Sequence, residues 1–72
     1  MNKKNKIKII VNGKQMTINF KYSLKNLIDH LKLPIKKIAI ELNKQIIDKK
    51  KINKIILKSG DKIEIVNFIG GG

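Results

Sequence analysis

The pair Asn12-Gly13, which lies between two runs of alternating apolar residues, constrains the fold more than any other feature. Asn-Gly favours a two-residue type I′ turn, because both central positions of that turn need a positive φ. Such a turn pairs the strand Ile7–Val11 with a second strand over Lys14–Phe20. Residues opposite one another in a hairpin share a face of the sheet. The register therefore predicts one apolar face, formed by Ile7, Ile9, Met16, Ile18 and Phe20.

A short amphipathic helix is predicted over Ser23–Leu31. Ser23 suits the N-cap, where a hydroxyl oxygen accepts a hydrogen bond from an unpaired backbone N–H. Pro34 ends the helix before it, because the residue preceding a proline avoids helical geometry. Apolar residues recur at helical spacing and form one stripe, made by Leu24, Leu27, Ile28 and Leu31. A helix this short is marginal alone, so we expect its stripe to pack on the apolar face of the hairpin.

After Pro34 the sequence returns to strand patterns. Alternation predicts a strand over Ile38–Leu42, with Ile38, Ile40 and Leu42 on one face. Asn43-Lys44 favours a tight turn, and Gln45–Ile47 forms a short return arm with Ile47 opposite Ile40. The connection 48–58 follows, with room for one helical turn. Its apolar residues are expected to pack against the core: Ile52, Ile55, Ile56 and Leu57.

The last strand is predicted over Lys62–Ile69, after a turn at Ser59-Gly60-Asp61. Ile63 and Ile65 share one face, whereas Val66 and Phe68 have the other parity. The adjacent pair Ile65-Val66 indicates either a strand buried on both faces or a bulge. A central position beside the first strand would explain burial on both faces.

The predicted order is two strands, one helix and three strands. This is an α+β, β-grasp (ubiquitin-like) arrangement: a mixed five-strand sheet with one main helix packed on one face. We expect one domain over residues 1–69, followed by a flexible glycine tail over residues 70–72. Glycine has no Cβ, so such a tail can extend into a channel that is too narrow for other residues.

The composition excludes several classes of function. The chain has 72 residues, which allows one small domain, and it has no cysteine and one histidine, His30. It carries five acidic residues, so neither a Ser/His/Asp constellation nor a metal site can be argued on this chain. We expect His30 to be a surface or boundary residue, and no metal or cofactor to be bound. No segment has the character of a signal peptide or a membrane span.

The net charge of +12 comes entirely from lysine. A basic small protein suggests nucleic acid or an anionic membrane as a partner. However, the lysines are spread along the chain, arginine is absent, and the three aromatic residues form no stacking motif. Codons rich in A and T would give the same excess of Lys, Ile and Asn, so we do not expect nucleic acid as the main partner. Lys49–Lys51 is the one dense run, and it could steer an acidic partner.

Several local features occur together along the chain: Asn12-Gly13-Lys14, Leu33-Pro34, Ile38-Ala39-Ile40-Glu41-Leu42-Asn43, Gly60-Asp61, Ile63-Glu64-Ile65-Val66 and Gly71-Gly72. Together they resemble the ThiS family, the sulfur carrier proteins of thiamin biosynthesis. The resemblance covers nearly the whole chain. Two features depart from the family pattern, namely a third glycine, Gly70, and a heavier lysine load.

The resemblance implies a protein cosubstrate rather than an enzyme. In the family, a partner related to ubiquitin-activating enzymes uses ATP and Mg²⁺ to adenylate the terminal carboxylate, here that of Gly72. A persulfide on a donor protein supplies the sulfur of a Gly72 thiocarboxylate, which thiazole synthase uses. Gly70 and Gly71 would enter the partner's active site, and Phe68 and Ile69 are candidates for docking contacts, with core packing as the alternative for Phe68. The expected location is a bacterial cytoplasm or an organellar stroma or matrix.

Three other functions stay open from the sequence. The small subunit of molybdopterin synthase has the same thiocarboxylate chemistry, but the short chain and its ending favour the thiamin carrier. A lysine-rich nucleic-acid-binding module would bind DNA or RNA with a steep dependence on salt. A ubiquitin-like modifier would form an isopeptide bond with a lysine of its target.

Overall fold

The structure is a computed structural model, and it describes residues 5–68 of the chain. The strands are β1 (Lys6–Val11), β2 (Lys14–Asn19), β3 (Ile38–Leu42), β4 (Gln45–Ile46) and β5 (Lys62–Asn67). The helices are α1 (Leu24–His30) and two 3₁₀ segments, η1 (Ile35–Lys37) and η2 (Lys49–Lys54). The strand order across the sheet is β2-β1-β5-β3-β4. β1 and β5 are parallel and the other pairs are antiparallel, so the mixed five-strand β-grasp sheet is confirmed.

The hairpin forms as the Asn-Gly pair predicts. Asn12 and Gly13 have φ values of 50° and 82°, and β1 pairs with β2 in the predicted register, with Ile9 opposite Met16. Phe20 is the exception, because β2 ends at Asn19 and Phe20 is 58% exposed. The chain turns away at Lys21, whose φ is 64°. The prediction that Phe20 extends the core face is therefore wrong.

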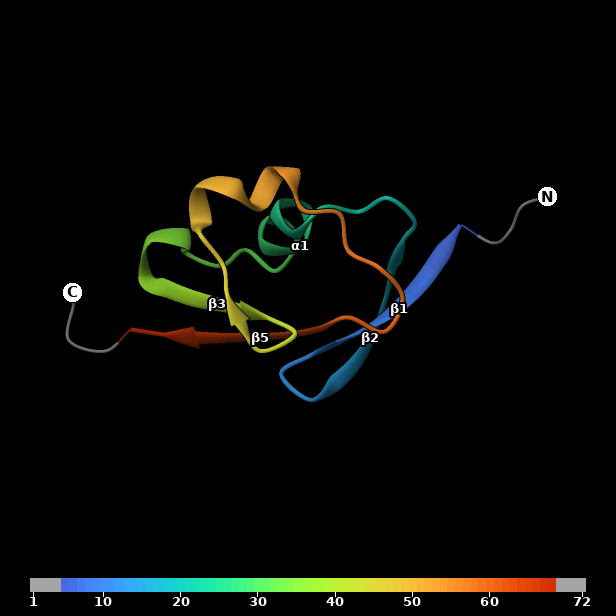
Figure 1. Cartoon of the computed structure of the whole chain (residues 1–72), viewed down its shortest axis with the longest axis horizontal. Helices are drawn as coiled ribbons and strands as arrows, with labels where there is room; N and C mark the ends of the chain where they lie inside the picture. The colour runs from blue at the N-terminus through green and yellow to red at the C-terminus, as the bar shows by residue number, and fades with distance from the viewer. Residues whose placement is uncertain (1–4, 69–72) are drawn as a thin grey trace.

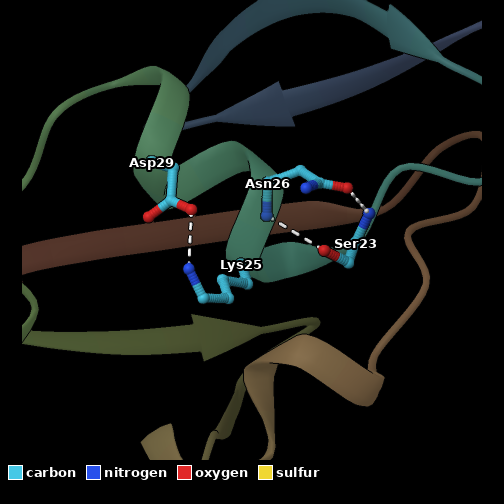
Figure 2. Close-up of polar contacts among 4 residues, drawn as sticks. All are labelled: Ser23, Lys25, Asn26 and Asp29. Carbon is cyan, nitrogen blue, oxygen red and sulfur yellow. Dashed lines mark hydrogen bonds and ion pairs between the residues drawn. The ribbon is translucent and has the colours of Figure 1, made fainter.

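Helix α1 begins with a capping box, in which the side chains of Ser23 and Asn26 each accept a hydrogen bond from the backbone N–H of the other residue (Figure 2). The Ser23 hydroxyl oxygen accepts from the Asn26 backbone N–H at 2.9 Å, and the Ser23 backbone N–H donates to the Asn26 side-chain oxygen at 3.0 Å. On the exposed side of the helix, the Lys25 ammonium contacts the carboxylate of Asp29, one turn further along, at 2.7 Å. The opposite side is buried, as the apolar stripe predicts.

The core lies between the sheet and the two helical segments, α1 and η2, which cover the same face (Figure 1). Its fully or nearly fully buried members come from every layer: Ile9, Ile18, Leu24, Leu27, Ile28, Ile38, Ile40, Ile52, Leu57 and Ile63. Ile56 is 47% exposed, so the prediction that it packs against the core is wrong, whereas Ile52 and Leu57 are buried as expected. The other face of the sheet has no helical segment over it within residues 5–68.

β5 occupies the central position that was predicted for the last strand, but it ends at Asn67. Its pairing with β3 is continuous from Leu42 opposite Ile63 to Ile38 opposite Asn67, so it contains no bulge against β3. Val66 is 59% exposed, so the strand is not buried on both faces either. Both readings of the Ile65-Val66 pair are therefore wrong: β5 is an ordinary strand with one buried face and one open face.

Candidate functional site

The candidate site is the end of β5, because the predicted glycine tail follows it. Phe68 is the last residue that the structure describes, so the predictions for Ile69, Gly70, Gly71 and Gly72, and the boundary between domain and tail, lie outside the described residues. What the structure places is the strand that leads to them (Figure 1).

On the β3 side, pairing holds β5 up to its last described residue. Asn67 lies opposite Ile38, and the Phe68 backbone N–H donates to the Lys37 carbonyl at 2.8 Å. The position and direction of the chain are thus set by hydrogen bonds as far as Phe68.

On the β1 side, a turn residue extends the pairing beyond the end of its own strand. The Asn12 side-chain oxygen accepts from the Ile65 backbone N–H at 2.8 Å, and its amide donates to the Ile65 carbonyl at 3.3 Å. The Asn12 backbone N–H donates to the Ile63 carbonyl at 2.9 Å. The Asn12 side chain therefore extends the β1–β5 hydrogen-bond ladder beyond Val11, the last residue of β1.

A second asparagine, Asn43, forms similar hydrogen bonds with the backbone at the beginning of β5. Asn43, in the turn between β3 and β4, accepts on its side-chain oxygen from the Lys62 backbone N–H at 2.9 Å. Its side-chain amide donates to an Asp61 carboxylate oxygen at 3.0 Å, and its backbone N–H donates to the Lys62 carbonyl at 2.8 Å. Asn43 also has a left-handed φ of 51°, so both asparagines combine a turn conformation with a side-chain clamp on β5.

Asp61 fixes the turn through which the chain enters β5. Its second carboxylate oxygen accepts from the Lys58 backbone N–H at 2.8 Å, and its backbone carbonyl accepts from the Ile10 N–H at 2.9 Å. Gly60 has a φ of 88°, a left-handed conformation that glycine adopts without strain. Turn preference alone already accounts for Asn and Asp at these positions, so their second role, holding the backbone of β5, gives no separate signal in the sequence.

Phe68 is 50% exposed, so ordinary core packing does not describe it. The Lys49 ammonium lies 5.2 Å from the centre of its ring, within the range of a cation–π contact. Val66, two residues earlier, is exposed on the open face of the sheet. We call Val66 and Phe68 the exit patch.

The Lys49–Lys51 run does not act as one solvated patch. The Lys49 ammonium donates to the carbonyls of Ile35 at 2.9 Å and Ile38 at 2.6 Å, which ties η2 to the start of β3. Lys50 and Lys51 are exposed, so any steering of an acidic partner is left to those two.

Among residues 5–68, no group of three or more His, Cys, Asp or Glu side chains gathers to hold a metal ion. His30 is exposed at the end of α1, as expected. No helix between residues 5 and 68 has the length and apolar character to cross a membrane.

Comparison with known proteins decides the family. A sequence profile of the ThiS family matches residues 9–72, which is most of the chain and includes the terminal glycines. The chain belongs to the ThiS family. This is the family of sulfur carriers of thiamin biosynthesis that the sequence resemblance indicates.

Solved structures and sequence relatives agree with this membership. The crystal structure of the thiamine biosynthesis protein ThiS from Geobacter metallireducens superposes with a TM-score of 0.78 at 28% identity, over 92% of this chain and 100% of that one. The protein ycf40 of Porphyra purpurea is 32% identical over 92% of this chain and 93% of its own length. A thiazole synthase of Paramagnetospirillum magneticum is 33% identical over 92% of this chain, which spans only 20% of that protein.

Proposed function

We propose that this chain carries sulfur as a thiocarboxylate on Gly72 and delivers it for thiazole formation. The observation that carries the proposal is that the ThiS family match runs through residue 72, directly after a strand clamped up to Phe68. The carboxylate of Gly72 is then the reacting group, and the domain serves to present it.

The Gly72 carboxylate must be activated before sulfur can be added to it. A terminal carboxylate has a model-peptide pKa of about 3.5, so it is ionised at neutral pH and is a poor electrophile. The Gly72 carboxylate attacks the α-phosphorus of ATP and releases pyrophosphate, which gives an acyl-adenylate. The terminal sulfur of a donor persulfide attacks the acyl carbon and AMP leaves, which gives an acyl disulfide. A thiol then attacks the donor sulfur, so that the S–S bond breaks, a disulfide forms and the Gly72 thiocarboxylate is released. ATP and Mg²⁺ belong to the activating partner.

The tail glycines suit this role because each lacks a Cβ. Gly71 and Gly72 enter the partner's active site as an extended segment, and Gly70 acts as the joint. Phe68 and Ile69 make docking contacts beside it. In support, the exit patch exposes two large apolar side chains, Val66 and Phe68, on described residues next to the tail.

The proposed partners are a ubiquitin-activating-type adenylating enzyme, a persulfide donor and thiazole synthase. The similarity to proteins named thiazole synthase supports the last of these. The place of action that we propose is a bacterial cytoplasm or an organellar stroma or matrix.

Mass spectrometry of the C-terminal peptide tests the proposal, after incubation with ATP, Mg²⁺, the activating enzyme and a persulfide donor. We expect one oxygen of Gly72 to be replaced by sulfur. Gly71→Val should abolish the exchange, while Lys25→Met, a control on the exposed side of α1, should retain it. Both variants should keep the wild-type circular dichroism spectrum. An unmodified wild-type peptide, or normal turnover of Gly71→Val, would contradict the proposal.

The thiazole assay separates this pathway from molybdopterin synthesis, which would use the same modified terminus. The thiocarboxylate form should support thiazole formation by purified thiazole synthase. Sulfur transfer to a pterin precursor without thiazole formation would assign the chain to the other pathway.

A further inference from the structure

The large apolar side chains that residues 5–68 expose fall in different places on the fold. Val66 belongs to the exit patch, and Ile46 lies on the same open face of the sheet. Phe20 and Ile56 instead line one open cavity of about 670 Å³. Its floor consists of buried Leu57 and half-buried Ile7. We call this cavity the entry cavity, because it adjoins the segment that leads into β5.

Backbone hydrogen bonds fix the shape of the entry cavity. The Leu57 N–H donates to the Tyr22 carbonyl at 2.8 Å, and the Leu24 N–H donates to the Ile55 carbonyl at 2.8 Å. Ser23 and Ile56 pair between them as an antiparallel bridge. Side chains alternate along an extended segment, so Leu57 turns inward and Ile56 must turn outward. The exposure of Ile56 is therefore built into the pairing.

The backbone of Phe20 is held by the residue that precedes β1. Its backbone N–H donates to the Asn5 carbonyl at 2.7 Å, and the Lys21 ammonium lies 5.8 Å from the centre of its ring. Two large apolar side chains thus stand preformed around a concave surface. A partner that binds there does not have to order these two side chains, so the entropic cost of association is lower.

The charge around the cavity selects among possible occupants. Its polar lining consists of Lys21, Lys58 and Ser59, without an acidic side chain. A second copy of this chain, with a net charge of +12, would be repelled, and the chain's own first residues include Lys3 and Lys4. A concave site also suits a projecting side chain better than the plane of a lipid surface.

We propose that the entry cavity is a second protein-docking site, which receives a large apolar side chain from an acidic segment of a partner protein. The apolar side chain fills the space between Phe20 and Ile56. Carboxylates that flank it pair with Lys21 and Lys58. The site lies at the beginning of β5, about 20 Å from the exit patch by the length of a six-residue strand. Partner proteins can therefore contact the entry cavity and the exit patch at the same time. This consequence rests on the proposed function, which assigns the exit patch to docking.

An NMR titration of the full-length, ¹⁵N-labelled chain tests the site. The probe is a synthetic peptide with one phenylalanine between two pairs of glutamates. We expect amide shifts to concentrate at Phe20, Lys21 and 56–59, and added salt to weaken binding. Ile56→Ser should raise the Kd at least about tenfold, equivalent to about 1.4 kcal/mol. Ile46→Ser, the matched control on the open face of the sheet, should leave the Kd unchanged.

Four results would overturn the proposal. The first is a titration in which shifts are absent or gather at Val66 and Phe68. The second is equal binding of a peptide in which alanine replaces phenylalanine, since charge alone would then account for it. The third is that the peptide fails while phosphatidylglycerol vesicles bind in an Ile56-dependent manner. The fourth is self-association that Ile56→Ser removes. The titration does not use the tail, so its failure and a failure of thiocarboxylate formation are separate results.

Discussion

The clamp between Asn12 and β5 gives the sharpest test of how the structure positions the tail. The substitution is Asn12→Gly, which keeps the turn because glycine adopts the φ of 50° that Asn12 has. It removes the two side-chain hydrogen bonds to Ile65. A typical hydrogen bond contributes about 1 kcal/mol net, and both bonds are exposed, so we expect a total loss of about 1–2 kcal/mol. For a domain of this size, that corresponds to a fall in Tm of roughly 4–16 °C.

Urea denaturation measures this loss, with an unchanged m-value as evidence that the unfolded state is comparable. Hydrogen exchange adds a local readout, since the Ile65 amide has Asn12 as its acceptor. Its exchange should accelerate by more than the global loss of stability explains.

The matched control is Lys44→Gly, a substitution at another left-handed turn position, with a φ of 72°. The Lys44 side chain is exposed, so glycine there relieves the strain of the left-handed conformation without removing a buried side chain. We expect its stability to be unchanged or up to about 1 kcal/mol higher. If Asn12→Gly behaves like Lys44→Gly, the clamp contributes nothing and the reasoning is refuted.

Two further substitutions, Ser23→Ala and Lys49→Met, test the supports of α1 and η2, each beside a control at an exposed lysine. Ser23→Ala should lower the free energy of unfolding, measured by thermal unfolding, by about 1 kcal/mol through loss of the cap. Lys25→Met should lower it by only a few tenths of a kcal/mol, because the pair with Asp29 is exposed. The reverse order would contradict the capping role. Lys49→Met should cost about 1–3 kcal/mol in urea, since it removes two charged hydrogen bonds to carbonyls. Exposed Lys50→Met should stay within about 0.5 kcal/mol, and equal losses would contradict the anchoring of Lys49.

The elements whose local and long-range signals agree were predictable from the sequence. The Asn12-Gly13 turn set the register of β1 and β2, and alternation gave the bounds of β3. The helical stripe and Ser23 placed α1. In each case a short-range preference and the need to bury one face point to the same answer, so one sequence pattern is enough.

Other features could not be predicted, because apolar character does not reveal which side of a segment meets the core. Phe20 and Ile56 both continue apolar runs, yet the end of β2 at Asn19 and the Ser23–Ile56 bridge leave them outside. Lys49 belongs to a charged run that is typical of a solvated surface. Only the three-dimensional approach of the Ile35 and Ile38 carbonyls makes it an anchor.

Three of the residues that carry the family resemblance, Asn12, Asn43 and Asp61, fix the backbone of β5 or the turn before it. Asn12 holds Ile65, Asn43 holds Lys62, and Asp61 closes the turn that precedes the strand. The motif therefore describes how a central strand is fixed from both sides and at its start. Substitution of Asn12, whose contact lies nearest the end of β5, should loosen the exit of the strand and so lower the yield of thiocarboxylate through positioning. Substitutions at Gly71 should act on the reacting segment itself, with the stability of the domain unchanged. A variant such as Asn12→Gly that loses stability and yield together, beside Gly71→Val that loses yield alone, would separate the two contributions.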